Sequence, residues 1–126
     1  MAHLPFRLML ALTIAGAAVA STADAVPISD ARLIAGVKHE VVKELKDPES
    51  VRLRDVRVIH DNDGSVVCGE LNAENSFGAY VGFRPFYGHL KCTDSMKYFS
   101  AHVQGVGDEI QIRVFPKMWL QFCDRH

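Results

Sequence analysis

The stretch between residues 66 and 87, which reads VVCGELNAENSFGAYVGFRPFY, constrains the fold more than any other part of the chain. Its two ends are rich in valine and aromatic residues, which favour β-strands. Between them lie asparagine, serine and glycine, whose side chains or backbone freedom suit tight turns. The pattern predicts two β-strands joined by a loop that forms its own hydrogen bonds. Gly69, Gly78 and Gly82 are expected to mark bulges or close backbone approaches, because glycine weakens a plain strand.

This stretch, with KDPES at 46–50 and RDV at 54–56, resembles a pattern of small secreted or prophage-associated bacterial proteins. The shared order is CGE, then NA-x-NS-x-G, then Y-x-GF, and the match spans residues 46–87, about a third of the chain. That family is uncharacterised, so the resemblance implies a compact exported domain and no particular activity. The chain has Ala79 where the family more often has glycine, and Glu74 where lysine is more common. Glu74 argues against a basic role for the loop.

The N-terminal segment, residues 1–25, is predicted to be a signal peptide rather than part of the fold. Arg7 precedes an apolar run of about a dozen residues at 8–19. Such a run fits the core of a signal peptide and is shorter than the ~20 residues of a membrane span. Cleavage is expected after Ala25, with cleavage after Ala20 as the alternative, and an uncleaved membrane anchor is less favoured. Residues 26–126 are long enough for a single small domain.

The chain has three cysteines, Cys68, Cys92 and Cys123. Export favours a disulfide, because disulfides persist in oxidising compartments. One pair and one free thiol is the simplest outcome. The favoured pair is Cys68–Cys123, which would tie the C-terminal segment to the central stretch. The alternatives are Cys92–Cys123 and a link between two chains through the odd thiol. Closing the long Cys68–Cys123 loop would stabilise the fold by about 4 kcal/mol.

The periodicity of apolar residues predicts an α+β fold. At residues 29–46 they recur at helical spacing with charged residues on the other side, so we expect a helix that covers one face of a sheet. Ser29 or Asp30 would cap this helix, and Pro48 would stop it. We expect β-strands at residues 54–60, 65–71, 79–87, 96–103 and 109–115, a hairpin turn at 61–64, a loop at 88–95 and a final helical turn at 117–122. The prediction is one N-terminal helix packed on an antiparallel meander of about five strands.

The chain carries no familiar motif of a catalytic, phosphate-binding or dinucleotide-binding site. Its formal net charge of −1 gives no basic field that would attract nucleic acid. The spacing of histidines and cysteines matches no zinc pattern, so we expect no metal and no cofactor. Glu70 is the one candidate for a general acid, although its motif contains no second carboxylate. A disulfide or core role suits Cys68 better than a role as nucleophile.

Aromatic residues crowd the region around residues 77–87 and form the strongest candidate binding site. Five aromatics occur within eleven residues, which exceeds what one sheet face normally hides. Core packing is the simpler interpretation of Phe83 and Tyr80, and we expect other members to be exposed as a recognition patch. The predicted binding residues are Asn72, Asn75, Ser76, Phe77, Tyr80, Arg84, Phe86 and Tyr87.

These features favour an exported, non-catalytic binding module, such as an inhibitor or an immunity-type protein of the cell envelope. The expected location is periplasmic or secreted. The expected partner is a protein or a glycan of the envelope and not nucleic acid. No membrane span is expected after signal cleavage, and the protein is expected to be a monomer or a weak dimer. Two alternatives stay open: a small envelope hydrolase that uses Glu70, and a structural component of the envelope.

Overall fold

A computed structural model describes residues 27–62 and 64–124. The predicted signal peptide lies outside these residues, and so does Asp63 of the predicted hairpin turn. The described elements follow in the order α1 (Asp30–Lys43), the 3₁₀-helix η1 (Pro48–Ser50), β1 (Arg52–Asp61), β2 (Gly64–Asn72), β3 (Arg84–Cys92), β4 (Lys97–Val103) and α2 (Glu109–Cys123). The strands form one antiparallel sheet in the order β1-β2-β3-β4. The α+β class and the antiparallel meander are confirmed, with four strands in place of five.

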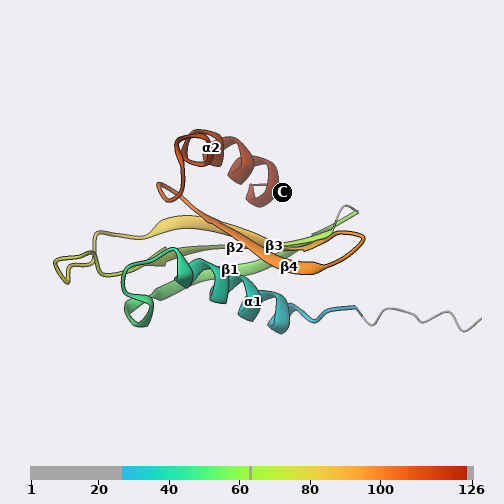
Figure 1. Ribbon diagram of the computed structural model, residues 1–126, viewed down its shortest axis with the longest axis horizontal. Coiled ribbons are helices and arrows are strands. Elements are labelled where there is room, and N and C mark those ends of the chain that lie inside the picture. Colours follow the sequence, from blue (N-terminus) through green and yellow to red (C-terminus); the bar gives the residue numbers. More distant parts are fainter. Residues whose placement is uncertain (1–26, 63, 125–126) are drawn as a thin grey trace, which may run out of the picture.

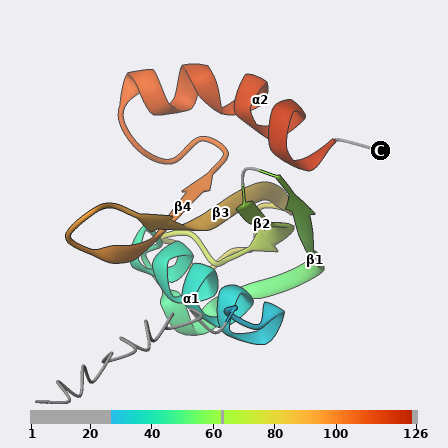
Figure 2. The same ribbon diagram turned by 90° about the vertical axis from the view of Figure 1, so that its right-hand side faces the viewer.

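The two helices cover opposite faces of this sheet (Figures 1 and 2). Helix α1 lies along one face, and α2 lies across the other (Figure 2). Side chains alternate between the two faces of a strand, so each strand contributes to two separate packing layers. The sheet is therefore the middle layer of three.

Helix α1 begins where the sequence predicts. The Ser29 side chain caps it by accepting a hydrogen bond from the backbone N–H of Arg32 at 3.4 Å. Asp30 places a negative charge in the first turn, and Lys43 places a positive one in the last, both of which suit the helix dipole. The α-helix ends at Lys43, three residues earlier than the predicted end.

The larger core lies between α1 and the sheet. Every fourth residue of α1 from Leu33 onward is buried there, namely Leu33, Val37 and Val41. They pack against four buried residues of the strands: Val67, Leu71, Phe86 and Val103. Gly88 allows α1 to approach β3, because a Cβ atom at this position would lie only 2.5 Å from the Val37 side chain.

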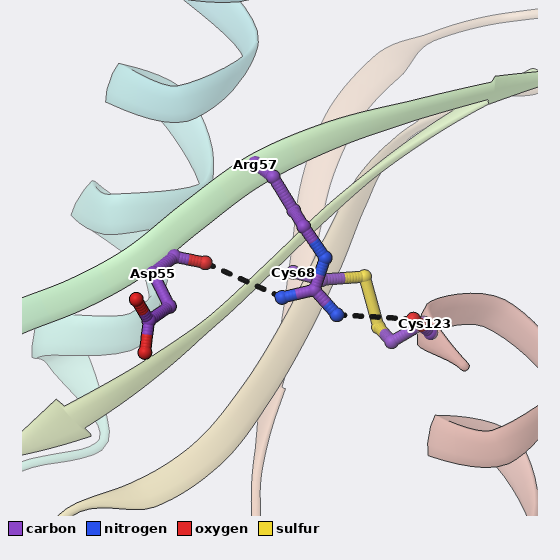
Figure 3. The surroundings of a disulfide bond; sticks show 4 residues. All are labelled: Asp55, Arg57, Cys68 and Cys123. Carbon is purple, nitrogen blue, oxygen red and sulfur yellow. Dashed lines mark hydrogen bonds between the residues drawn. A yellow bond between two sulfur atoms is a disulfide. The ribbon is translucent and has the colours of Figure 1, made fainter. Parts of the chain in front are cut away.

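The smaller core lies between α2 and the sheet. It contains the buried residues Val66, Cys68, Tyr87, Phe115 and Cys123. Within it, Cys68 of β2 forms a disulfide with Cys123 at the end of α2 (Figure 3). This confirms the favoured pairing, and Cys92 is a free, exposed thiol. Trp119 and Phe122 pack against the same cluster.

Helix α2 replaces the strand predicted at residues 109–115. The alternation of Ile110, Ile112 and Val114 fits a strand, yet all three side chains are exposed on the helix. A capping box starts the helix: the Asp108 carboxylate accepts from the Gln111 backbone N–H at 2.8 Å, and the Gln111 side chain accepts from the Asp108 N–H at 3.0 Å. Local capping therefore outweighs alternation, and the helix continues through Pro116.

Strand β3 also differs from its prediction. It begins at Arg84 rather than at residue 79, and it runs through to Cys92 across most of the predicted loop. Residues 79–83 belong to the connection before it, where Tyr80 forms only an isolated bridge with Glu74. The β3 residues from 86 to 92 pair with β4, and this pairing extends the strand beyond the aromatic run.

Candidate functional site

The connection between β2 and β3, residues 73–83, is here called the Asn loop. Asn75 organises its tip: the side-chain oxygen accepts hydrogen bonds from the backbone N–H groups of Phe77 at 2.9 Å and Ala79 at 3.2 Å. The Asn75 backbone N–H also donates to the carbonyl of Ala79 at 2.9 Å. Gly78 takes a φ of 73°, which glycine adopts without strain. The loop forms its own hydrogen bonds, as predicted.

Several side chains fasten the Asn loop to the rest of the molecule. Ser50 of η1 accepts twice: its hydroxyl from the Glu74 N–H at 3.0 Å, and its carbonyl from the Tyr80 hydroxyl at 2.8 Å. At the sheet end, the Asn72 side chain accepts from the Gly82 N–H at 3.2 Å. Lys46, just after α1, donates to the Ser76 hydroxyl at 2.6 Å. The loop is thus held at its base, middle and tip.

The tip presents an apolar side chain to solvent. Phe77 is 93% exposed, although its backbone is fixed by Asn75. Val81, on the returning arm of the loop, is 66% exposed. An isolated exposed aliphatic residue is ordinary on a protein surface, whereas aromatic residues are enriched at binding hot spots. A fixed backbone that displays a phenyl ring has the form of a recognition anchor.

A cavity of about 250 Å³ separates the Asn loop from the end of α1. Three of the predicted binding residues, Asn75, Ser76 and Arg84, line it together. Lys46 and Arg84 bring positive charge, which Glu44 and Glu74 balance. The Arg84 guanidinium donates to the carbonyl of Gln104 at 3.3 Å, which holds it at the wall. The cavity therefore suits a polar, uncharged group.

The structure corrects the predicted patch at two positions. Phe86 is 1% exposed and belongs to the core beneath α1, and Tyr87 is 5% exposed and belongs to the core beneath α2. Burial in the α2 core also raises the pKa of the Tyr87 hydroxyl. Neither side chain can meet a partner in the folded protein. Of the five aromatic residues at 77–87, Phe77 is exposed, whereas Tyr80 and Phe83 are half-buried.

Glu70 does not have the surroundings of a general acid. Arg54 donates to its carboxylate at 2.8 Å. This hydrogen bond, aided by the positive charges of Arg54 and Arg57, lowers the pKa of Glu70. A general acid at neutral pH needs a raised pKa, because it must hold a proton to donate. The electrostatics therefore speak against hydrolysis through this residue.

The sequence did not predict a series of three polar residues in contact with one another, Asp30, His60 and Ser65. His60 Nε2 lies 3.0 Å from an Asp30 carboxylate oxygen, and His60 Nδ1 lies 2.7 Å from the Ser65 hydroxyl. These are the residue types of a serine nucleophile. However, the His60 and Asp30 side chains are 58% and 57% exposed, and strand alternation places the Ser65 side chain on the α1 side of β2, although Ser65 also borders a cavity beside Val66. Together these three residues link α1 to the β1–β2 hairpin.

Within residues 27–62 and 64–124, no three histidine, cysteine or acidic side chains gather in a way that would hold a metal ion. In the same ranges, neither α1 nor α2 has the length and apolar character of a membrane-spanning helix. Comparisons with protein-family models, with curated proteins and with solved structures gave no match to this chain. The functional argument therefore rests on the geometry of the site.

Proposed function

We propose that the chain is an exported, non-catalytic binding protein that recognises a protein of the cell envelope through the Asn loop. The observation that carries the proposal is the combination of a backbone fixed by Asn75 with a Phe77 side chain that is almost fully exposed. A loop that is ordered before binding loses less conformational entropy when it meets its partner. Phe77 enters an apolar pocket of that partner, and Val81 contacts the rim.

Two further features support a location outside the cytoplasm. The Cys68–Cys123 disulfide suits an oxidising compartment. The apolar run at residues 8–19 fits an export signal. A small, stapled protein with a rigid apolar loop is suited to an inhibitory or immunity-type role, in which the loop occupies a functional cleft of the partner. The resemblance to small secreted and prophage-associated proteins agrees with export and implies no particular activity.

The proposal is tested by capturing proteins from an envelope extract with immobilised wild type and with two matched variants. Phe77→Ser removes the ring from the loop tip. Ile110→Ser removes another exposed apolar side chain, from α2, and serves as the control. Both variants are expected to keep the wild-type melting temperature, because neither side chain is buried.

Loss of a hot-spot aromatic costs about 2 kcal/mol or more, which corresponds to roughly a thirtyfold weaker complex. We expect wild type and Ile110→Ser to capture the same protein and Phe77→Ser to lose it. Equal capture by all three forms, or no specific capture by wild type, refutes the proposed function.

A further inference from the structure

Three arginines of β1 point to the same side of the sheet. Arg52, Arg54 and Arg57 pair with alternate residues of β2, namely Asn72, Glu70 and Cys68. A bulge between Arg54 and Arg57 takes up the extra residue, so all three side chains lie on the face that α2 partly covers. We call Arg52, Arg54 and Arg57 the arginine row.

Each arginine of the row lies over an aromatic ring from another segment. The guanidinium carbon of Arg52 lies 4.2 Å from the ring centre of Tyr80, and that of Arg54 lies 3.9 Å from that of Phe83. Arg57 lies 6.0 Å from the ring centre of Trp119 on α2. Stacking fixes the plane of a guanidinium and leaves the N–H groups at its edge free to meet carboxylates.

The members of the row are engaged differently. Arg57 donates to the backbone carbonyls of Asp55 at 3.3 Å and Cys123 at 3.0 Å, so it joins the bulge to the end of α2 (Figure 3). Arg54 holds Glu70. Within the described residues, Arg52 forms no ion pair, and its guanidinium lies over the Tyr80 ring. Arg52 and Arg54 are both exposed.

Glu70 shows how the row receives a carboxylate. Its oxygen lies 2.8 Å from Arg54 Nε, and the neighbouring arginines lower its pKa. Asp55, whose carboxylate lies 3.9 Å from Arg54 Nε, makes a weaker contact. The row thus already stabilises one internal carboxylate, and an external carboxylate would meet the same donors in the same orientation.

We propose that Arg52 and Arg54, supported by Tyr80 and Phe83, bind an acidic polysaccharide through its carboxylates. Side chains two residues apart on a strand repeat at about 6.6 Å, which suits a polymer with regularly repeated charges. The rims of Tyr80 and Phe83 offer apolar surface to the sugar rings. Nucleic-acid binding usually uses many phosphate contacts, and this row offers few guanidiniums beside two carboxylates. Tyr80 and Phe83 belong to the Asn loop, but the site does not include Phe77 and does not depend on the proposed protein partner.

Glu70 competes with such a ligand for Arg54, and this competition separates a binding role from a purely structural one. Isothermal titration calorimetry with polygalacturonate measures the affinity of the wild type and the variants. Fully methyl-esterified polygalacturonate provides the uncharged control, and double-stranded DNA provides a different polyanion. Arg32→Gln, which removes an exposed arginine from α1 on the other side of the sheet, is the matched control variant.

We expect wild type to bind polygalacturonate and neither control ligand. Arg52→Gln and Arg54→Gln are each expected to weaken binding by about fivefold, as for a well-oriented exposed ion pair, while Arg32→Gln leaves it unchanged. Glu70→Gln is expected to tighten binding by about threefold, because Arg54 is released from its carboxylate. A structural role alone would not produce this gain.

The proposal is overturned if wild type fails to bind polygalacturonate, if the methyl ester binds equally well, or if Glu70→Gln weakens binding. The proposal is likewise overturned if wild type binds DNA more tightly than polygalacturonate and if Arg32→Gln weakens binding as much as Arg52→Gln does. Those results would show non-specific electrostatic attraction. Circular dichroism of each variant establishes that it is folded. If Arg54→Gln proves unfolded, Arg52→Gln and Glu70→Gln still decide the outcome.

Discussion

Removing the disulfide should reveal how much α2 depends on it. In the variant Cys68→Ala/Cys123→Ala, the constraint on a segment with a sequence separation of 55 is lost. The chain-entropy relation for a loop of this length gives about 4 kcal/mol of lost stability. Small proteins have unfolding free energies of about 5–15 kcal/mol, so this loss is a large part of the total.

The loss should not fall evenly on the molecule. Only Phe115 and Cys123 of the fifteen α2 residues are buried, whereas α1 packs three buried residues on the sheet. Without the disulfide, α2 keeps a small apolar contact and should detach before the sheet unfolds. Trp119 is the only tryptophan of the chain and lies in the α2 core, so its fluorescence reports the docking of α2.

Urea unfolding followed by Trp119 fluorescence and by far-ultraviolet circular dichroism tests this reasoning. For wild type we expect coincident transitions. For the double variant we expect both transitions at lower urea, with the fluorescence transition first. Cys92→Ala, which removes the exposed free thiol, is the control and should unfold like wild type. Coincident transitions with a loss below about 1 kcal/mol would refute the reasoning.

Three further predictions follow from the packing and the titrating groups. Phe86→Ala should lower the unfolding free energy by about 3–5 kcal/mol, because the ring fills the α1 core, whereas Phe77→Ala should change it by less than about 0.5 kcal/mol; equal effects in urea titrations would contradict the assigned burial. Gly88→Ala should cost about 1–3 kcal/mol, since the new Cβ would meet Val37 at 2.5 Å and the carbonyl of Ser100 at 2.7 Å, and an unchanged melting temperature would argue against this close approach. Burial, with a contribution from Lys91, lowers the pKa of His89 and His102, so the unfolded state binds more protons below about pH 6.5. The unfolding free energy should therefore fall as the pH is lowered from 7 through the folded-state pKa values, and His89→Phe and His102→Phe should each weaken this pH dependence. The same urea midpoint at pH 7.5 and pH 5 in wild type would contradict this prediction.

Local chemistry made much of the fold predictable. Ser29 is a helix cap with an apolar stripe behind it, and asparagine, serine and glycine predict a self-bonded loop because their side chains or backbone freedom act over a few residues. The disulfide was also within reach, since only three pairings of three cysteines exist. The helical turn predicted at residues 117–122 lies within α2, but the first half of this helix was predicted as a strand because the alternation of Ile110, Ile112 and Val114 outweighed the Asp108–Gln111 capping box, which was the signal present in the sequence.

Which aromatic residues are exposed could not be predicted without knowing that α2 covers the second face of the sheet. Five aromatics exceed what one covered face can hide, but two helices cover both faces, so Phe86 and Tyr87 are buried on opposite sides. The arginine row could not be predicted, because its stacking partners come from the Asn loop and from α2. Which ring meets which guanidinium depends on tertiary packing and leaves no periodic trace in the sequence.

The central claim is that the Asn loop is rigid before it meets a partner and so presents Phe77 in a fixed position. Backbone ¹⁵N relaxation of the free protein measures this directly through the order parameters of Phe77 and Ala79. The hydrogen bonds from these two amides to Asn75 predict values near the ~0.85 of a rigid backbone in wild type and a clear drop in Asn75→Ala. Wild-type values below about 0.6, typical of a flexible segment, would contradict the claim.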